Sequence, residues 1–241
     1  KLYGNDPTVA LRELIQNAAD AVQARRKYQK RPADWGLITV GLLSEGGRTW
    51  LVVEDNGIGM SEQVLTGPLL DFGTSFWRSP LAMDEFPGLM AAGMHAIGRF
   101  GIGFFSVFML GTVVRVYSRR CDKGQETGRL LEFRGGTTAR PILSPATGDP
   151  VPIDGGTRVE VLLKDDPNGA NGLLAINSHN NRTMSLGGLV GALAPNLDVA
   201  IAIMTQEGTQ PIVQPGDWLK ISDLDLVRRL NGSLDKSEEG T

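Results

Sequence analysis

The chain has 241 residues, of which 41% are hydrophobic and 21% are charged, an ordinary composition for a globular protein with a substantial core. No apolar run approaches the roughly 20 residues that a membrane-spanning helix needs, and the first residues lack the apolar stretch of a signal peptide, so we expect a cytoplasmic protein without a membrane partner. The net charge of −3 gives no electrostatic reason to expect nucleic acid as the main partner.

The first part of the chain predicts a long helix followed by a β-hairpin. Apolar residues recur at helical spacing over residues 8–31, with Thr8 as the expected N-cap and Pro32 as the stop. Two runs rich in apolar and β-branched residues, 37–42 and 50–54, flank a Gly-Gly turn. This pattern predicts two antiparallel strands.

The remaining elements alternate without a regular βαβ order. Residues 55–103 are rich in Gly and small side chains, which favours a binding loop or lid. The later patterns predict helices over 104–110 and 186–193 and strands over 112–118, 130–133, 157–163 and 199–204. The fold class we expect is α+β, a two-layer α/β sandwich with a mixed, mainly antiparallel sheet. Because the chain turns polar near its end, we expect one domain over 1–215 and a C-terminal extension or linker over 216–241.

Three polar residues share one stripe of the first predicted helix. Glu13, Asn17 and Asp20 are spaced i, i+4 and i+7, and their neighbours are mostly apolar. We expect this stripe to face a cavity or water. Taken alone, the pattern favours the solvated side of an amphipathic helix.

A carboxylate and two glycines follow the second strand of the predicted hairpin. Asp55 stands where that strand ends, and Gly57 and Gly59 come directly after it. A carboxylate in this position can accept a hydrogen bond from an exocyclic amino group, and glycines let the backbone approach a flat ring. An ordinary Asx-Gly turn gives the same pattern.

Three glycines, Gly98, Gly101 and Gly103, precede the apolar helix predicted over 104–110. Backbone N–H groups beside a helix N-terminus can bind phosphate without a lysine, and a glycine hinge without a ligand is the alternative. The spacing fits neither the P-loop, since no Gly-Lys-Ser/Thr follows, nor the Rossmann pattern. A nucleotide site here requires a different fold.

In chain order, the motifs Glu-x-x-x-Asn-x-x-Asp-Ala, Asp-x-Gly-x-Gly-Met and Gly-x-Gly-Phe-x-Ser resemble those of the GHKL superfamily of ATPases (gyrase, Hsp90, histidine kinase, MutL). The residues of these motifs most closely resemble those of the Hsp90 N-terminal ATP-binding domain over 11–17, 55–60 and 97–106. Residues 156–164 resemble its Gly-Thr-x-Val strand. The resemblance covers about residues 7–204. It implies the Bergerat fold with an ATP lid.

The resemblance also implies a role for each matching residue. Glu13 would orient and deprotonate the attacking water, and Asn17 would give an amide oxygen to Mg²⁺. Asp55 would accept the adenine amino hydrogen, which favours ATP over GTP. Asp20 would have a supporting role. The other implied contacts are Gly59 and Thr157 beside Asp55, partly through water, Met60 and Phe104 against the adenine, and the backbone of Gly98, Gly101, Ile102 and Gly103 at the phosphates.

The sequence departs from the Hsp90 pattern at the lid entrance and before the first helix. Trp77 occupies the lysine position of the Gly-x-Ser-x-Lys motif, so Arg78 or Arg99 is the candidate that compensates phosphate charge. Few residues precede the first helix, where Hsp90 has elements for dimer contacts, so we do not expect ATP-driven dimerisation of this chain. A nucleotide-dependent dimer of a full-length protein stays open. Without a following domain that donates an arginine, we expect slow turnover.

Five basic residues cluster at the end of the first predicted helix. Cations there complement the helix dipole, which is the interpretation we favour, and a nucleic-acid patch is the alternative. They are Arg25, Arg26, Lys27, Lys30 and Arg31.

We therefore expect an ATPase: Mg²⁺-dependent ATP binding and slow hydrolysis by an Hsp90-like domain that switches a lid, in a molecular chaperone or remodelling protein with protein clients or partner domains. One alternative is the GHKL module of a DNA-transaction protein such as MutL, a type II topoisomerase or a MORC protein. Another is a nucleotide-binding scaffold without hydrolysis, against which Glu13 argues. Kinship of fold does not identify the client.

Overall fold

The computed structural model describes residues 6–71, 76–89, 93, 103–148, 150–177 and 182–232. The helices are α1 (Thr8–Gln29), α2 (Glu62–Thr66), α3 (Pro80–Glu85), α4 (Leu186–Leu193) and α5 (Asp223–Leu230), with 3₁₀ helices η1 (Phe76–Arg78), η2 (Phe104–Met109), η3 (Gln125–Thr127) and η4 (Asp217–Leu219). The strands are β1 (Leu37–Glu45), β2 (Arg48–Asp55), β3 (Val113–Arg119), β4 (Arg129–Phe133), β5 (Ile142–Pro145), β6 (Gly156–Leu162), β7 (Ala175–Asn177), β8 (Arg182–Thr183), β9 (Ala200–Thr205) and β10 (Gly208–Val213).

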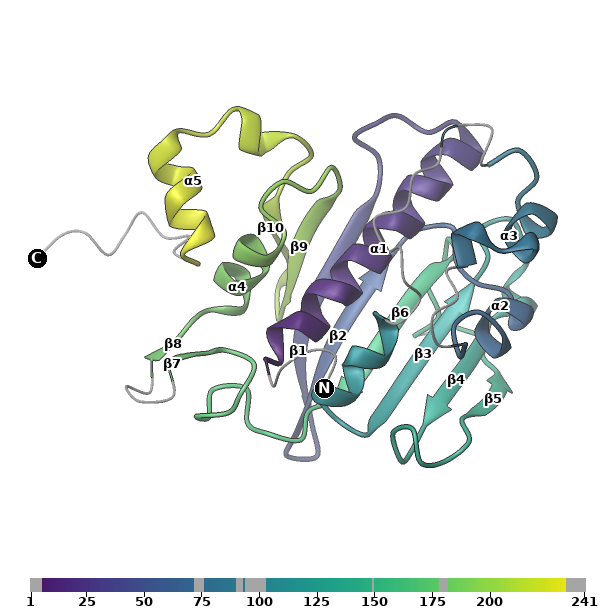
Figure 1. Ribbon diagram of the computed structural model, residues 1–241, viewed down its shortest axis with the longest axis horizontal. Coiled ribbons are helices and arrows are strands. Elements are labelled where there is room, and N and C mark those ends of the chain that lie inside the picture. The colour runs from purple at the N-terminus through teal and green to yellow at the C-terminus, as the bar shows by residue number, and fades with distance from the viewer. Residues whose placement is uncertain are drawn as a thin grey trace, which may run out of the picture.

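An eight-stranded sheet forms one layer, and α1 and α4 lie on the face turned toward the viewer in Figure 1. The strand order is β10-β9-β1-β2-β6-β3-β4-β5. Strands β1 and β9 pair in parallel, and the other neighbours in this sheet are antiparallel. The expected α+β sandwich with a mixed, mainly antiparallel sheet is confirmed.

Helix α1 forms because its apolar residues fall on one side at helical spacing. They bury against the inner face of the sheet and make up the main core with β1, β2, β3 and β6. The helix ends at Gln29, where Lys30 adopts a left-handed conformation (φ 52°) and its N–H bonds to the Arg26 carbonyl, two residues before Pro32. Thr8 is the first helical residue rather than the expected N-cap. Its N–H and Oγ1 both donate to Asp6 Oδ1, at 2.9 and 2.7 Å.

The predicted β1–β2 hairpin is confirmed. Glu45 pairs with Arg48 across a two-residue turn in which Gly46 and Gly47 have φ of 56° and 73°. Two positive φ values are what this tight turn requires, and glycine adopts them without a steric penalty.

Several elements differ from the sequence pattern. Residues 55–103, predicted as a loop or lid, contain α2, η1 and α3. The predicted helix over 104–110 is the 3₁₀ helix η2. The pattern predicts neither β5 nor β10, since each is a short edge strand that contains a proline.

Structure continues beyond residue 215. Helix α5 lies beside α4 (Figure 1), and Arg229 of α5 makes two 2.8 Å hydrogen bonds to the Asp217 carboxylate. The same guanidinium reaches the carbonyl of Pro195 at 3.3 Å. The division into 1–215 and 216–241 stays a prediction.

The outer face of the sheet carries what we call the ion-pair ladder, a row of alternating charges on β2, β6, β3 and β4. Its members are Glu54, Arg158, Glu160, Arg115 and Glu132, with neighbouring nitrogen–oxygen distances of 3.0, 2.9, 3.7 and 3.3 Å. The Arg115 guanidinium also lies over the Trp50 ring, 4.5 Å from its centroid. Opposite charges on directly paired strands stabilise a sheet. This row does so on the face opposite α1 and α4.

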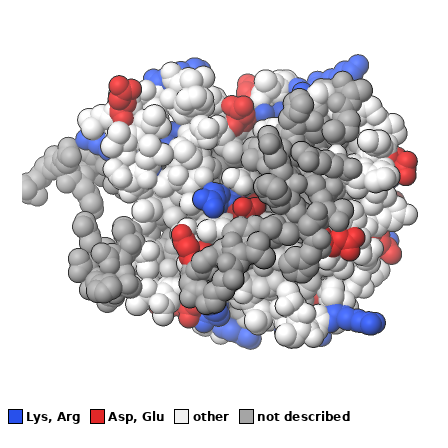
Figure 2. Space-filling view, in the orientation of Figure 1, with Lys and Arg blue, Asp and Glu red and all other residues white. Residues whose placement is uncertain are grey.

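The described residues on the surface of the inner layer show no concentration of one charge (Figure 2). In Figure 2, blue and red side chains are interspersed with each other and with white ones over the face that carries α1. None of the described helices has the length and apolar character needed to span a bilayer.

Candidate nucleotide site

Asp55 lies at the inner-face end of β2. Side chains alternate along a strand, so Leu51 and Val53 enter the core and Asp55 follows them on the same face. The residue is only 6% exposed, and its Oδ1 accepts a 2.8 Å hydrogen bond from the Gly57 N–H. In the sheet it stands opposite Thr157 at the start of β6. The fold therefore brings together two residues that the motifs predict to meet one ligand.

Burial raises the pKa of Asp55 to about 7. The N–H groups of Gly57 and Thr157 and the charge of Arg25 act in the opposite direction, while Glu54 adds to the rise. None of the ion pairs among the described residues includes Asp55. Its charged form is therefore held by backbone dipoles, and it titrates in the range where ligands can shift it.

Glycines let the chain after Asp55 pass between α1 and the end of β3. Gly59 has φ of 71°, and a β-carbon there would overlap the carbonyl of Arg119. A β-carbon on Gly57 would overlap the backbone of Ala21 in α1. The Ile58 N–H donates to the Ala21 carbonyl at 2.9 Å. These contacts fix the loop on the helix.

Ser118, a residue that the motifs do not include, connects three parts of this region. Its hydroxyl is fully buried, accepts a hydrogen bond from the Met60 N–H at 2.9 Å and donates to the Gly156 carbonyl at 3.0 Å. It also lies 2.8 Å from Thr157 Oγ1. Ser118 thus holds Met60 and Thr157, two predicted adenine neighbours. A polar residue on the core face of a strand, after Val114 and Val116, is the sequence signal that points to it.

Glu13 and Gly103 come together at the other end of α1. A β-carbon on Gly103 would overlap the Glu13 carboxylate, so the glycine makes room for it. Burial raises the pKa of the half-buried Glu13, and Arg12 lowers it. Asn17, one turn later, is exposed, but Asp20 is completely buried. The expected open stripe therefore includes Glu13 and Asn17 but not Asp20.

Phe104 is buried in the main core. Its ring centroid lies 5.9 Å from those of both Phe105 and Phe133, and the partly buried Met60 packs against the same core. The predicted phosphate contacts of Gly98, Gly101 and Ile102 lie outside the described residues, as do Arg99 and the side chain of Arg78.

Trp77, at the position where the motif has lysine, is part of an apolar cluster. Its ring packs edge-on against Phe76 with centroids 5.1 Å apart. The two rings pack against a buried set that joins the end of α1, the loop after β2 and the segment around α3, namely Ala24, Ile58, Phe86 and Leu89. Aromatic rings here anchor residues 76–89 to α1.

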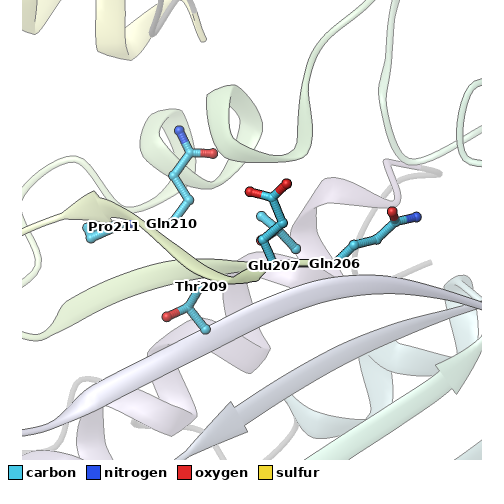
Figure 3. Close-up of a pocket in the computed structure, with 6 residues that line it drawn as sticks. Gln206, Glu207, Thr209, Gln210 and Pro211 are labelled. Atoms are coloured by element: carbon cyan, nitrogen blue, oxygen red, sulfur yellow. The ribbon is translucent and has the colours of Figure 1, made fainter.

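A hollow at the β9–β10 hairpin contains none of the predicted site residues. Its lining residues, shown in Figure 3, are Thr205, Gln206, Glu207, Thr209, Gln210 and Pro211. They are polar or edge-strand side chains with one ionisable group. Strand β1 separates this hairpin from β2, so the hollow is distinct from the candidate site.

Comparison with known proteins decides the family. Residues 5–133, more than half of the chain, match the family of histidine kinase-, DNA gyrase B- and HSP90-like ATPases. The chain belongs to this ATPase family. The resemblance inferred from the three motifs is thereby confirmed.

Relatives of the ATPase domain include chaperones. This chain is 30% identical over 216 residues to the chaperone protein HtpG of Nitrobacter hamburgensis, and the match covers 86% of this chain and 31% of the relative. It is 42% identical over 176 residues to HtpG of Azorhizobium caulinodans, covering 67% and 25%. The mitochondrial heat shock protein of 75 kDa from Bos taurus is 31% identical over 163 residues, covering 67% and 22%. The chain spans less than a third of the length of each of these relatives.

Proposed function

We propose that this ATPase domain binds ATP with Mg²⁺, hydrolyses it slowly and thereby switches a lid, as part of a chaperone or remodelling protein. One observation carries the proposal: Asp55 is a buried carboxylate that backbone N–H groups, rather than a cation, hold in place. The relatives named above are chaperones and a heat shock protein, which favours a chaperone over a DNA-transaction protein.

Recognition of the base follows from the acceptor capacity of Asp55. A carboxylate has about four acceptor positions, and the N–H groups of Gly57 and Thr157 account for two. The remaining capacity suits the exocyclic amino group of adenine, whereas guanine has a carbonyl oxygen at the equivalent ring position. The Thr157 hydroxyl and the backbone at Gly59 would complete the contact, directly or through water.

Glu13 would act at the other end of an extended ligand. Glu13 and Ala21, which contacts the loop after Asp55, are eight residues apart on α1, or roughly 12 Å along the helix axis. A carboxylate with a raised pKa is a stronger base, so Glu13 would take a proton from the attacking water more readily than an exposed glutamate. Gly103 lets the Glu13 carboxylate lie directly against the backbone that precedes η2, where phosphate oxygens are predicted to bind.

The described residues fit a magnesium ion that arrives with the nucleotide. They contain no group of three or more acidic, His or Cys side chains that would hold a metal by itself. The exposed amide of Asn17 offers one oxygen ligand near Glu13, and Mg²⁺ usually combines few protein ligands with phosphate oxygens and water. When bound, the ion would neutralise charge on the phosphates.

Contact between the base site and the lid segment supports the proposed switch. Ile58 belongs to the loop that holds Asp55 and also to the cluster that anchors Phe86 and Leu89. A base that orders this loop would therefore stabilise the anchored position of residues 76–89.

Titration calorimetry with ADP and a non-hydrolysable ATP analogue, in the presence of Mg²⁺, tests the proposal. In Asp55→Asn the amide oxygen can keep the Gly57 bond, but its NH₂ would then face the adenine amino group, so we expect at least about 100-fold weaker binding. Glu54→Gln is the matched control, because it removes the neighbouring carboxylate, whose partner is Arg158 on the outer face. Because Glu54 adds to the rise in the pKa of Asp55, its removal should favour the carboxylate form, so this variant should bind at least as tightly as the wild type.

Hydrolysis is tested with Glu13→Ala. We expect binding to persist while turnover falls by at least about 100-fold, the usual contribution of a general base. A wild type that binds neither nucleotide, or an Asp55→Asn variant that binds normally, would overturn the proposed site. A Glu13→Ala variant with normal turnover would overturn only the role of Glu13.

A further inference from the structure

We propose that Arg25 is a positioning residue for base binding: it clamps the loop after β2 to the turn before β6 and so fixes Asp55 relative to Thr157. The inference rests on the proposed function, in which these two residues receive the adenine. In the sequence, Arg25 is only one of five basic residues at a helix end.

Arg25 reaches two chain segments at once. It is 4% exposed, and its Nη1 donates a 2.7 Å hydrogen bond to the Asn56 carbonyl. The same nitrogen lies 3.4 Å from the Gly57 carbonyl and 3.5 Å from the Gly155 carbonyl. Residues 56 and 57 follow Asp55 directly, and Gly155 stands two residues before Thr157. One guanidinium nitrogen therefore touches the chain beside both predicted base contacts.

Other contacts aim the side chain. Nε donates to Gln29 Oε1 at 3.1 Å, and the guanidinium lies over the Trp35 ring, 5.0 Å from its centroid. A cation stacked on an aromatic face and bonded at Nε loses little further freedom when it binds carbonyl oxygens. The clamp is thus preorganised by α1 and the segment that follows it.

The partners of Arg25 distinguish it from the arginines that stabilise the outer face. None of the ion pairs in the described part of the chain includes Arg25, although burying a cation without a carboxylate is costly. Its lowered pKa reflects this burial, with charge effects from Cys121, Arg31, Asp154 and Arg119. Its contacts with two loops of the binding site explain why the fold contains a buried cation here.

The charge of Arg25 also acts on Asp55. It lowers the pKa of that carboxyl group, against the effects of burial and of Glu54. Removal of the positive charge should therefore move the ionisation of Asp55 to higher pH. Because the carboxylate is the stronger acceptor for an amino group, ADP affinity should rise as the pH passes through about 7, and this midpoint reports the charge beside Asp55.

Arg26 provides a matched control on the same helix. It is partly buried, its pKa is also lowered by burial, and its Nε donates to the Trp35 carbonyl rather than to either loop of the site. Arg26→Gln should cost stability of the same kind without moving Asp55 or Thr157.

The experiment measures ADP affinity by calorimetry from pH 6 to 8.5 for the wild type, Arg25→Gln, Arg25→Lys and Arg26→Gln, with thermal unfolding of each nucleotide-free protein. For Arg25→Gln we expect about tenfold weaker binding at pH 7 and a midpoint at higher pH than in the wild type. Arg25→Lys keeps the charge but lacks the planar fork, so it should bind roughly threefold more weakly with an unchanged midpoint. Arg26→Gln should bind within twofold of the wild type.

The outcomes separate this proposal from the proposed function. If the wild type does not bind ADP, the proposed function fails. If Asp55→Asn abolishes binding but Arg25→Gln binds like Arg26→Gln with the wild-type midpoint, only the clamp is overturned. Should Arg25→Gln not fold, an Arg25→Lys protein that binds as tightly as the wild type overturns the clamp.

Discussion

Two adjacent carboxylates on β2 lie on opposite faces of the sheet and have opposite surroundings. Glu54 lies on the outer face and pairs with Arg158 at 3.0 Å. Asp55 lies on the inner face, is nearly completely buried and has a pKa raised to about 7. The outer face neutralises its charges in pairs, which favours the folded state. The inner face retains a charge that costs stability, and such groups cluster where proteins bind ligands.

The largest effect expected from this difference is a pH dependence of stability. An acid whose pKa is raised by folding binds its proton more tightly in the folded protein. The contribution of Asp55 to the free energy of unfolding is therefore complete below pH 3.8 and is lost as the pH rises through about 7. For Asp55 the loss is on the order of 4 kcal/mol. Asp55→Asn should remove this component, so the variant should exceed the wild type in stability at pH 8.

Denaturant unfolding of the nucleotide-free protein from pH 4 to 8 measures this loss. Glu54→Gln is the control: because Glu54 only adds to a rise that burial causes, this variant should keep most of the pH-dependent loss, with a somewhat smaller slope than the wild type. Parallel curves for the wild type and Asp55→Asn would show that the two carboxylates do not differ as described.

A second prediction concerns the glycine that lets the Asp55 loop pass β3. Gly59→Ala places a β-carbon against the Arg119 carbonyl, whereas Gly47→Ala, at a φ of 73° instead of 71°, meets nothing within 4 Å. Both substitutions strain a left-handed residue, by about 1–2 kcal/mol. We expect Gly59→Ala to cost roughly 2 kcal/mol more than Gly47→Ala and to abolish nucleotide binding. Equal losses in urea unfolding would mean that the loop is not held closely.

Ser118→Ala should have a smaller effect that still reaches the site. Without the hydroxyl, the Met60 N–H and Thr157 Oγ1 lose a buried partner, which should cost about 2 kcal/mol of unfolding free energy. ADP affinity should fall severalfold because both residues border the predicted adenine. Ser44→Ala, at an exposed position on β1, should change stability by less than about 0.5 kcal/mol. A Ser118→Ala protein with normal affinity would limit the role of Ser118 to the fold.

The smallest effect should come from the outer face. Arg158→Met removes the bonds to Glu54 and Glu160, while Glu160 keeps Arg115 at 3.7 Å. For partly exposed pairs we expect a loss of about 1 kcal/mol that shrinks at high salt. ADP affinity should not change. A tenfold change in affinity would instead show that the two faces are coupled.

The sequence predicts those features that depend on local periodicity or on a single turn. The span of α1 follows from its apolar stripe and Pro32, the hairpin from two glycines, and the position of Asp55 from the end of an apolar strand. Strands β5 and β10 are missed because they are short and contain Pro145 and Pro211, so packing rather than propensity decides them.

The parts of the site that sequence reasoning misses depend on partners distant in the chain. Ser118 matters because it contacts Met60 and Gly156, and Arg25 because it reaches Asn56 and Gly155. A motif records which residue types occur at fixed spacing, but not which side chain holds them in place. The roles assigned to Glu13 and Asn17 stay predictions until hydrolysis is measured.

The parallel pairing of β1 with β9 has a consequence for synthesis of the chain. Strand β1 ends at Glu45, but β9, the strand that pairs with its other edge, begins only at Ala200. Until β9 leaves the ribosome, β1 is the border of a partial sheet, with unpaired backbone groups and Leu37 near its open edge. Chains grow at about 5–20 residues per second, so this border stays uncovered for on the order of ten seconds or more. A nascent chain stalled before Ala200 should therefore be the form of this protein most prone to aggregate.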